Sequence, residues 1–450
     1  MSLAKARHQK SGQPELPQMR SDEADTATHS HRHPGSDDGL DIEAVVQRDN
    51  LLEALRRVQK NRGSPGVDGV TLEQLPNHLR AHWPRLRAEL LAGTYRPTPV
   101  LRREIPKAGG GTRQLGIPTV LDRFIQQAIL QVLQPKFDPT FSPHSYGFRP
   151  GRSAHMAVMA AKGFVLEGRR VVVDVDLEKF FDRINHDVMM GKLAHRIRDR
   201  RLLVLIRRYL EAGVMADGVI IERHEGSPQG GPLSPLLANV LLDEVDRELE
   251  RRGHTFARYA DDLNVYVRSK RAGERVMQLL RKLYARLRLR INEEKSAVAS
   301  VKERKFLGFS FYWRKNGPQL RVAPKAIEAF KDRVRELTSR TRGRSMTAIV
   351  ADLRMYLTGW RNYFGLAQTP AVFKGLDHWI RRRLRAYQLH HWRHGHVVYR
   401  ELLKRGVDSI RAAQTAKFVR SWWASSMSIA VRLALPNAHF DSIGLPRLVT

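Results

Sequence analysis

The chain has 450 residues, with 78 Lys and Arg against 46 Asp and Glu, which gives a formal net charge of +32. This surplus favours a polyanionic partner, because each neutralised phosphate releases counterions; a basic protein that is merely soluble is the alternative. The absence of cysteine excludes disulfides, thiolate zinc sites and a cysteine nucleophile. No apolar run reaches the ~18 residues of a membrane span, so we expect no membrane partner.

The N-terminal part begins with a polar segment, residues 1–40, which carries His29, His31 and His33 and is typical of a disordered leader. Apolar residues at helical spacing follow from Leu51. The remaining elements expected here are a hairpin of residues 95–105 and 113–117, joined by a glycine-rich tip, and an apolar helix over 122–133.

The middle of the chain alternates between strand and helix patterns, which predicts an α+β fold. Expected strands are 169–177, 304–313 and two strands that meet at a tight turn within 256–267. Expected helices are 187–212, 235–250 and 274–287. From about Pro324 the pattern becomes almost wholly helical and more basic.

Carboxylates gather at two places in this basic chain. Asp176 ends an apolar strand, and Asp261 and Asp262 lie at a turn between two apolar strands. Adjacent acidic groups repel each other unless a cation is bound between them. Three carboxylates around two Mg²⁺ ions ~4 Å apart would suit in-line phosphoryl transfer. An ordinary Asp-Asp turn with an unrelated strand-end aspartate is the alternative.

The motifs around these aspartates resemble a known family. Tyr259-Ala260-Asp261-Asp262 is similar to the signature of reverse transcriptases, and the segment 176–181 supplies that family's upstream aspartate followed by an aromatic residue. Further blocks follow in the order found in bacterial group II intron reverse transcriptases. They are Ile105-Pro106-Lys107 with 113–118, then 145–153, 227–235, 291–295 and 306–309.

This resemblance implies roles for individual residues. Asp176, Asp261 and Asp262 would be the catalytic residues and the ligands of two Mg²⁺ ions. The implied dNTP-binding residues are Lys107, Arg113, Phe181, Gln229 and Lys295, and the implied primer grip is Phe306, Leu307, Gly308 and Phe309. Lys107 and Arg113 would offer two cations to a triphosphate. The alternative is that these basic side chains at a hairpin tip are simply exposed to solvent. Phe181 fits a steric gate that favours deoxynucleotides, or a core position.

The segment 356–364 resembles the maturase-specific signature of group II intron-encoded proteins. In the segment that follows, apolar residues at helical spacing can pack into a core while the arginines between them face phosphates. We therefore predict RNA contacts at Arg381, Arg382, Arg383 and Arg385. A solvated arginine face, with Trp360 and Trp379 in the core, is the alternative. The chain ends at Thr450 without the cysteine-paired HNH region of many relatives, so it resembles the compact members of the family.

The fold implied is a right-hand polymerase. It comprises the leader (1–40), fingers with an N-terminal extension (41–165), a palm (166–315) and an all-α thumb/maturase region (316–450). The implied function is RNA-directed DNA polymerisation together with binding, splicing and mobility of a group II intron RNA. The partners would be that RNA, an RNA template with a DNA primer, target DNA and dNTP, in the bacterial cytoplasm or nucleoid. Two alternatives are a splicing-only maturase and a reverse transcriptase recruited to defence or diversification.

Overall fold

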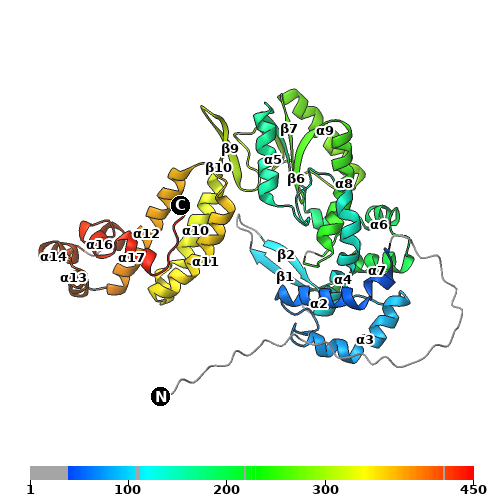
Figure 1. Ribbon diagram of the computed structural model, residues 1–450, viewed down its shortest axis with the longest axis horizontal. Helices are drawn as coiled ribbons and strands as arrows, with labels where there is room; N and C mark the ends of the chain where they lie inside the picture. The colour runs from blue at the N-terminus through cyan, green and yellow to red at the C-terminus, as the bar shows by residue number, and fades with distance from the viewer. Residues whose placement is uncertain are drawn as a thin grey trace, which may run out of the picture.

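The computed structural model describes residues 39–106, 112–216, 219–223, 225–228, 230–418 and 421–449. Figure 1 shows a mixed part, coloured blue to green, and a helical part, coloured yellow to red, with strands β9 and β10 between them. Both the α+β class and the helical C-terminal region agree with the sequence prediction. Within the described ranges, no helix combines the length and the apolar character that crossing a bilayer requires.

The N-terminal elements form a helical layer beside a hairpin. They are α1 (Ile42–Val45), α2 (Arg48–Lys60), α3 (Leu75–Leu91), β1 (Val100–Pro106), β2 (Thr112–Ile117) and α4 (Val120–Phe137). The predicted hairpin is present, because β1 and β2 pair antiparallel from Leu101↔Ile117 to Pro106↔Thr112. Two short strands that the sequence did not predict, β4 (Val214–Ala216) and β5 (Val219–Ile221), extend this sheet in the order β2-β1-β4-β5.

The second sheet is central to the mixed part. It has the order β6-β7-β3-β8 and consists of β3 (Val171–Val175), β6 (Thr255–Tyr259), β7 (Asp262–Val267) and β8 (Ala297–Ser300). Alternate residues of a strand point to opposite faces. Val173 and Val265 accordingly join one hydrophobic core, whereas Val172 and Tyr266 join a second core on the other face. The sheet therefore separates two cores, and both of them hold it in place.

Helices cover both faces of this sheet: α5 (Ala154–Leu166) lies on one face, and α8 (Ser234–Arg251) and α9 (Lys270–Arg286) lie on the other. Helix α6 (His186–Ala194) packs against α7 (Arg200–Glu211) and α8, and the 3₁₀ turns are η1 (Asp138–Thr140) and η2 (Phe180–Arg183). The prediction of one helix over 187–212 was wrong, since α6 and α7 are separate. The Asp199 carboxylate accepts a hydrogen bond from the backbone N–H of Arg201 (2.8 Å) and so starts a new helix.

The remaining elements follow the hairpin of β9 (Phe309–Arg314) and β10 (Gly317–Val322). Only the end of the strand predicted over 304–313 forms, because a tight turn at Leu307 and Gly308 precedes β9. The helices are α10 (Pro324–Leu337), α11 (Met346–Phe364), α12 (Pro370–Trp392), α13 (Gly395–Lys404), α14 (Ser409–Lys417), α15 (Trp422–Ser425), α16 (Ile429–Ala434) and α17 (Asn437–Ser442), with η3 (Arg340–Arg342).

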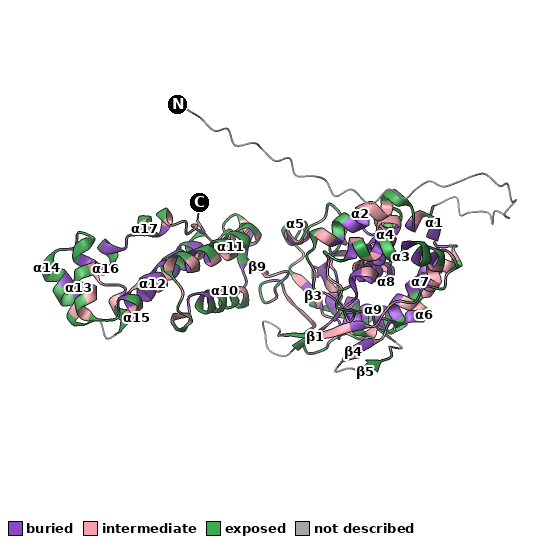
Figure 2. Ribbon diagram, turned by 90° about the horizontal axis from the view of Figure 1, so that it is seen from below, coloured by how far each residue is buried: buried purple, intermediate pink, exposed green. Residues whose placement is uncertain are grey.

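The core of the helical part is continuous with one face of the central sheet. Phe309 of β9, Phe330 of α10 and Leu384 of α12 belong to the same buried cluster as Val172 and Tyr266. Figure 2 shows buried positions along the inner faces of α10, α11 and α12, with exposed positions on α13 and α14. The helical part is thus joined to the sheet that carries the candidate site through the β9–β10 hairpin and α5.

Candidate active site

The Asp-Asp pair lies at a two-residue turn between β6 and β7. Tyr259 pairs with Asp262 across the hairpin, which leaves Ala260 and Asp261 as the turn. Ala260 has a φ of +57°, a conformation that L-residues adopt only at some cost in energy. The turn ends at Asp262, the first residue of β7. The predicted strand–turn–strand arrangement is therefore present.

Asp176 follows directly after β3, the neighbour of β7 in the sheet. Val175 pairs with Leu263 in the antiparallel register. The next step of that register takes Asp176 to Asp262, so the sheet brings two of the three predicted aspartates together. Its backbone is held by Ser296 and Asn292: the Ser296 hydroxyl accepts from the Asp176 N–H (3.0 Å), and the Asn292 N–H donates to the Asp176 carbonyl (2.8 Å).

A lysine from the segment after α9 joins these carboxylates. The ammonium of Lys295 lies 3.4 Å from the Asp176 carboxylate oxygen Oδ2. Both side chains are partly exposed, at 67% for Lys295 and 44% for Asp176, so solvent screens the pair. The predicted dNTP-binding residue Lys295 therefore lies beside a predicted catalytic residue.

The crowding of acidic groups affects Asp262 most. Burial, together with the negative charges of Asp174, Asp261 and Asp176, raises the pKa of Asp262 to about 8. Burial also raises the pKa of Asp174, even though Arg304 forms an ion pair with it (Nη2 to Oδ2, 2.6 Å). Ionisation of Asp262 is therefore unfavourable in the metal-free protein, and a bound cation would stabilise the ionised form.

This donor set suits a hard divalent cation, because carboxylate oxygens are the ligands that Mg²⁺ prefers. In the described part of the chain, no three His, Cys, Asp or Glu side chains are arranged to hold one metal ion. The fit therefore rests on the nature of the donors and on the raised pKa of Asp262. The sequence prediction of two Mg²⁺ ions remains a prediction.

The predicted dNTP-binding residues are only partly described. Lys107 and Gln229 lie outside the described residues, and Arg113 is described only as a backbone position of β2. Phe181 is 9% exposed and packs edge-on against Phe180, with 5.0 Å between the ring centroids. The backbone carbonyl of Phe181 accepts from the N–H of Ser227 (2.7 Å). The start of the 227–235 block therefore lies against the predicted steric gate.

The predicted primer grip is a tight turn between Phe306 and Phe309, whose backbones exchange two hydrogen bonds (2.8 and 2.9 Å). Leu307 and Gly308 have φ values of +50° and +82°, the pattern of a two-residue hairpin turn. The hydroxyl of Tyr363 on α11 donates to the Leu307 carbonyl (2.9 Å). The maturase-like signature helix therefore supports this turn.

The four predicted RNA-binding arginines on α12 have different surroundings. Arg381 is 2% exposed and pairs with Asp377 and Asp441, while Arg385 is 7% exposed and donates to the Leu435 carbonyl (2.8 Å). These internal contacts account for both residues, so we do not propose them as phosphate contacts. Arg382 and Arg383 are only partly buried and lie over Trp423 and Trp379. Phosphate contact remains a prediction for these two.

Sequence reasoning missed several buried residues behind the turn. Arg258 and Asp246 form a fully buried ion pair, and Asn239 is 1% exposed. The available signal was a charged residue inside the apolar strand 256–259, since a buried charge needs a partner.

Two known protein families match this chain, one in its mixed part and one in its helical part. Residues 105–311 match the family described as reverse transcriptase (RNA-dependent DNA polymerase). Residues 327–406 match the family described as the group II intron, maturase-specific domain. The chain therefore combines a reverse transcriptase domain with a group II intron maturase-specific domain, the combination that the sequence motifs predict. All three aspartates and the Phe306–Phe309 turn lie within the first match, and α11 lies within the second.

Three individual proteins are similar in sequence to part of this chain. Protein YkfC of Escherichia coli is 38% identical over 217 residues, which are 47% of this chain and 57% of that protein. The group II intron-encoded protein LtrA of Lactococcus lactis is 34% identical over 204 residues, 45% of this chain and 34% of that protein. The retron Mx65 reverse transcriptase of Myxococcus xanthus is 32% identical over 206 residues, 43% of this chain and 46% of that protein. The chain thus spans about a third to somewhat over half of these relatives.

Proposed function

We propose that this protein is an RNA-directed DNA polymerase that also binds a group II intron RNA and assists its splicing and mobility. The observation that carries the proposal is that Asp176, at the end of β3, meets the Asp261-Asp262 turn, at the start of the neighbouring strand β7. The match of 327–406 to the maturase-specific domain favours an intron RNA as partner over the alternative of a reverse transcriptase recruited to defence or diversification. The domain divisions 41–165, 166–315 and 316–450 remain part of the proposal.

In the proposed reaction, the 3′-hydroxyl of a DNA primer attacks the α-phosphate of a dNTP opposite an RNA template. Mg²⁺ held by Asp176, Asp261 and Asp262 would lower the pKa of the hydroxyl and stabilise the developing charge. Lys295, beside Asp176, is placed to neutralise the pyrophosphate leaving group. Phe181 would exclude a ribose 2′-hydroxyl, and the turn of Leu307 and Gly308 would hold the primer end.

The proposed RNA-binding role rests on charge and on the helical part. The net charge of +32 favours association with phosphates in general. Arg382 and Arg383 on α12 are the partly buried arginines of the predicted set, and each lies over a tryptophan ring. An intron RNA, an RNA template with its primer and a DNA target are the proposed partners.

The test is Mg²⁺-dependent extension of a labelled DNA primer on an RNA template, with wild type beside Asp261→Asn. Removal of a metal-binding carboxylate is expected to lower the extension rate by about a thousandfold or more, while binding of intron RNA is retained. Asp187→Asn is a matched control, because Asp187 is 72% exposed and pairs with Arg207 (3.0 Å), which is not one of the predicted site residues. Extension by Asp261→Asn at the wild-type rate would refute the assignment.

A further inference from the structure

The Ala260–Asp261 turn needs support from outside its own hairpin. Ala260 is held at a φ of +57°, which an alanine does not favour. Both neighbours of the turn, Tyr259 and Asp262, are fixed by their pairing across the hairpin. The positions of the two turn residues therefore depend on contacts made by the rest of the chain.

The first of these contacts comes from α8 and reaches the carbonyl side of the turn through Arg258, which is itself a residue of β6. Its Nη1 donates to the Ala260 carbonyl (2.9 Å). The side chain is fully buried, and Asp246 on α8 accepts from its Nε at 2.8 and 3.0 Å and from its Nη2 at 2.5 Å. The guanidinium is therefore fixed on α8 and holds the turn through one of its remaining donors.

Gly147 makes the second contact, on the amide side of the turn. A Cβ at position 147 would lie 2.2 Å from the backbone nitrogen of Ala260, so only glycine permits this approach. The segment that carries it is tied to β6, because the N–H of Tyr146 donates to the Arg258 carbonyl (2.8 Å). The turn is thus held between the Arg258 guanidinium and the Gly147 backbone.

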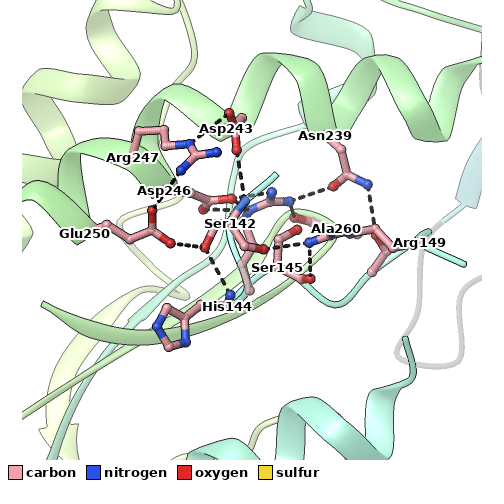
Figure 3. A network of polar contacts seen from close by, with 12 residues as sticks. Ser142, His144, Ser145, Arg149, Asn239, Asp243, Asp246, Arg247, Glu250 and Ala260 are labelled. Atoms are coloured by element: carbon pink, nitrogen blue, oxygen red, sulfur yellow. Dashed lines mark hydrogen bonds and ion pairs between the residues drawn. The ribbon is translucent and has the colours of Figure 1, made fainter. Parts of the chain in front are cut away.

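Asn239 on α8 connects these two supports. Its Oδ1 accepts from Arg258 Nη1 (3.0 Å), and its Nδ2 donates to the Gly147 carbonyl (2.9 Å). The side chain is 1% exposed, so both polar ends depend on these two partners. Figure 3 shows Asn239 above the strand that leads to Ala260, with Asp246 on the same helix.

We propose that Asn239 is a positioning residue for the catalytic turn: by joining Arg258 to Gly147 it fixes where Ala260 and Asp261 lie. This inference rests on the proposed polymerase function for its kinetic consequence. Its structural part, the ordering of the turn, does not depend on that function. A residue of this kind acts through the carboxylate that it positions, and misplacement of a reacting group by about 1 Å costs about 100-fold in rate.

Two variants test the proposal against a matched control. Asn239→Leu removes both hydrogen bonds at similar volume. Asn239→Asp keeps an acceptor for Arg258 but places a carboxylate oxygen where the donor to Gly147 was, so it separates the two hydrogen bonds in a second variant. The control, Glu250→Gln, lies at the far end of the same network. Glu250 accepts from the Ser142 hydroxyl (2.5 Å) and is outside the contacts described for the turn.

The first measurement is amide hydrogen exchange of the peptide that spans 256–267, in the metal-free full-length protein. Asn239→Leu is expected to increase exchange in this peptide about tenfold or more, with Asn239→Asp intermediate and Glu250→Gln at the wild-type rate. Unchanged exchange in Asn239→Leu would overturn the proposal, whatever the enzyme does.

The second measurement is steady-state primer extension with the amount of folded protein matched by circular dichroism. We expect kcat of Asn239→Leu to fall about 100-fold while KM for dNTP and template–primer affinity remain near wild type. A fall that follows only the folded fraction would show a purely structural role and overturn the proposal. If wild type itself fails to extend primers, the proposed function fails, and hydrogen exchange still decides the role of Asn239.

Discussion

Substitution of Asp246 by Asn is expected to destabilise the central sheet strongly, because it leaves the Arg258 guanidinium charged and unpaired in the interior. The two side chains are 1% and 0% exposed, and the closest N–O distance between them is 2.5 Å. Burial by itself lowers the pKa of Arg258, but the charge of Asp246 and its hydrogen bonds raise it above the usual value. Asparagine removes the effect of Asp246 that raises this pKa, but a guanidinium is not deprotonated in proteins, so the charge remains without its partner.

Loss of one partner of a buried ion pair costs about 3–5 kcal/mol in free energy of unfolding. For a domain of 150–250 residues, each kcal/mol shifts Tm by roughly 2–4 °C. The expected fall in Tm for Asp246→Asn is therefore about 6–20 °C. The double variant Asp246→Leu with Arg258→Met removes both charges, so we expect it to be more stable than Asp246→Asn alone.

Thermal unfolding followed by circular dichroism and by intrinsic fluorescence measures this effect. Glu248→Gln is the matched control on the same helix. Glu248 pairs at the surface with Arg251 (2.7 Å) and Arg252 (2.6 Å), where solvent screens ion pairs. If Asp246→Asn lowers Tm no more than Glu248→Gln does, the buried pair contributes no more than a surface pair and the reasoning is refuted.

Two further predictions concern the site itself. Burial, with the charges of Asp174, Asp261 and Asp176, raises the pKa of Asp262 to about 8, so the folded state keeps a proton that the unfolded chain releases above about pH 4. The Mg²⁺-free protein should therefore lose stability as pH rises from about 4 to 8, and Asp262→Asn should flatten that decline in Tm against pH. Tyr363→Phe removes the hydrogen bond to the Leu307 carbonyl (2.9 Å), so primer extension should fall about fivefold through a higher KM for primer, and an unchanged KM would contradict the support role.

Strand β3 and the turn that carries Asp261 and Asp262 could be predicted from the sequence because their signals are local. The run Val171–Val175 is rich in β-branched residues and is bounded by charge, and it forms β3. The acidic pair interrupts an apolar segment at the place where the chain reverses between β6 and β7. Asp176 and Asp262 lie opposite each other because of the register between β3 and β7. The order of the family motifs predicts that these aspartates meet, but it does not give the register.

The support behind the turn could not be predicted in the same way. Asn239 and Gly147 are 92 positions apart in sequence, and their contact exists only because the fold brings α8 against the segment before α5. A glycine that permits close approach and a glycine in a loop look the same in sequence. The sequence signal of Arg258, a charged residue inside an apolar strand, is weak in a chain that has 78 Lys and Arg residues.

The arginine run on α12 shows why composition overstates nucleic-acid contacts. Asp377, Arg381 and Arg385 follow one another at four-residue intervals and therefore share one face of the helix. On that face, Arg381 Nη1 pairs with Asp377 (3.2 Å), and the Leu448 N–H also donates to Asp377 (3.0 Å). The acidic residue one turn earlier was the signal that these arginines serve the packing of the C-terminal segment.

The region matched to the maturase domain and the candidate polymerase site are physically joined at α11. Tyr363 donates to the Leu307 carbonyl, Phe364 lies 5.3 Å from Phe309 between ring centroids, and His155 Nε2 lies 2.7 Å from the Tyr363 carbonyl. Burial, with the nearby charges of Tyr259 and Asp262, raises the pKa of Tyr363 as well. Substitutions in the signature 356–364 would therefore disturb the predicted primer grip whether or not that helix binds RNA. The proposed splicing and polymerisation roles are better separated at Arg382 on α12, whose guanidinium lies over Trp423 and takes no part in the contacts just described.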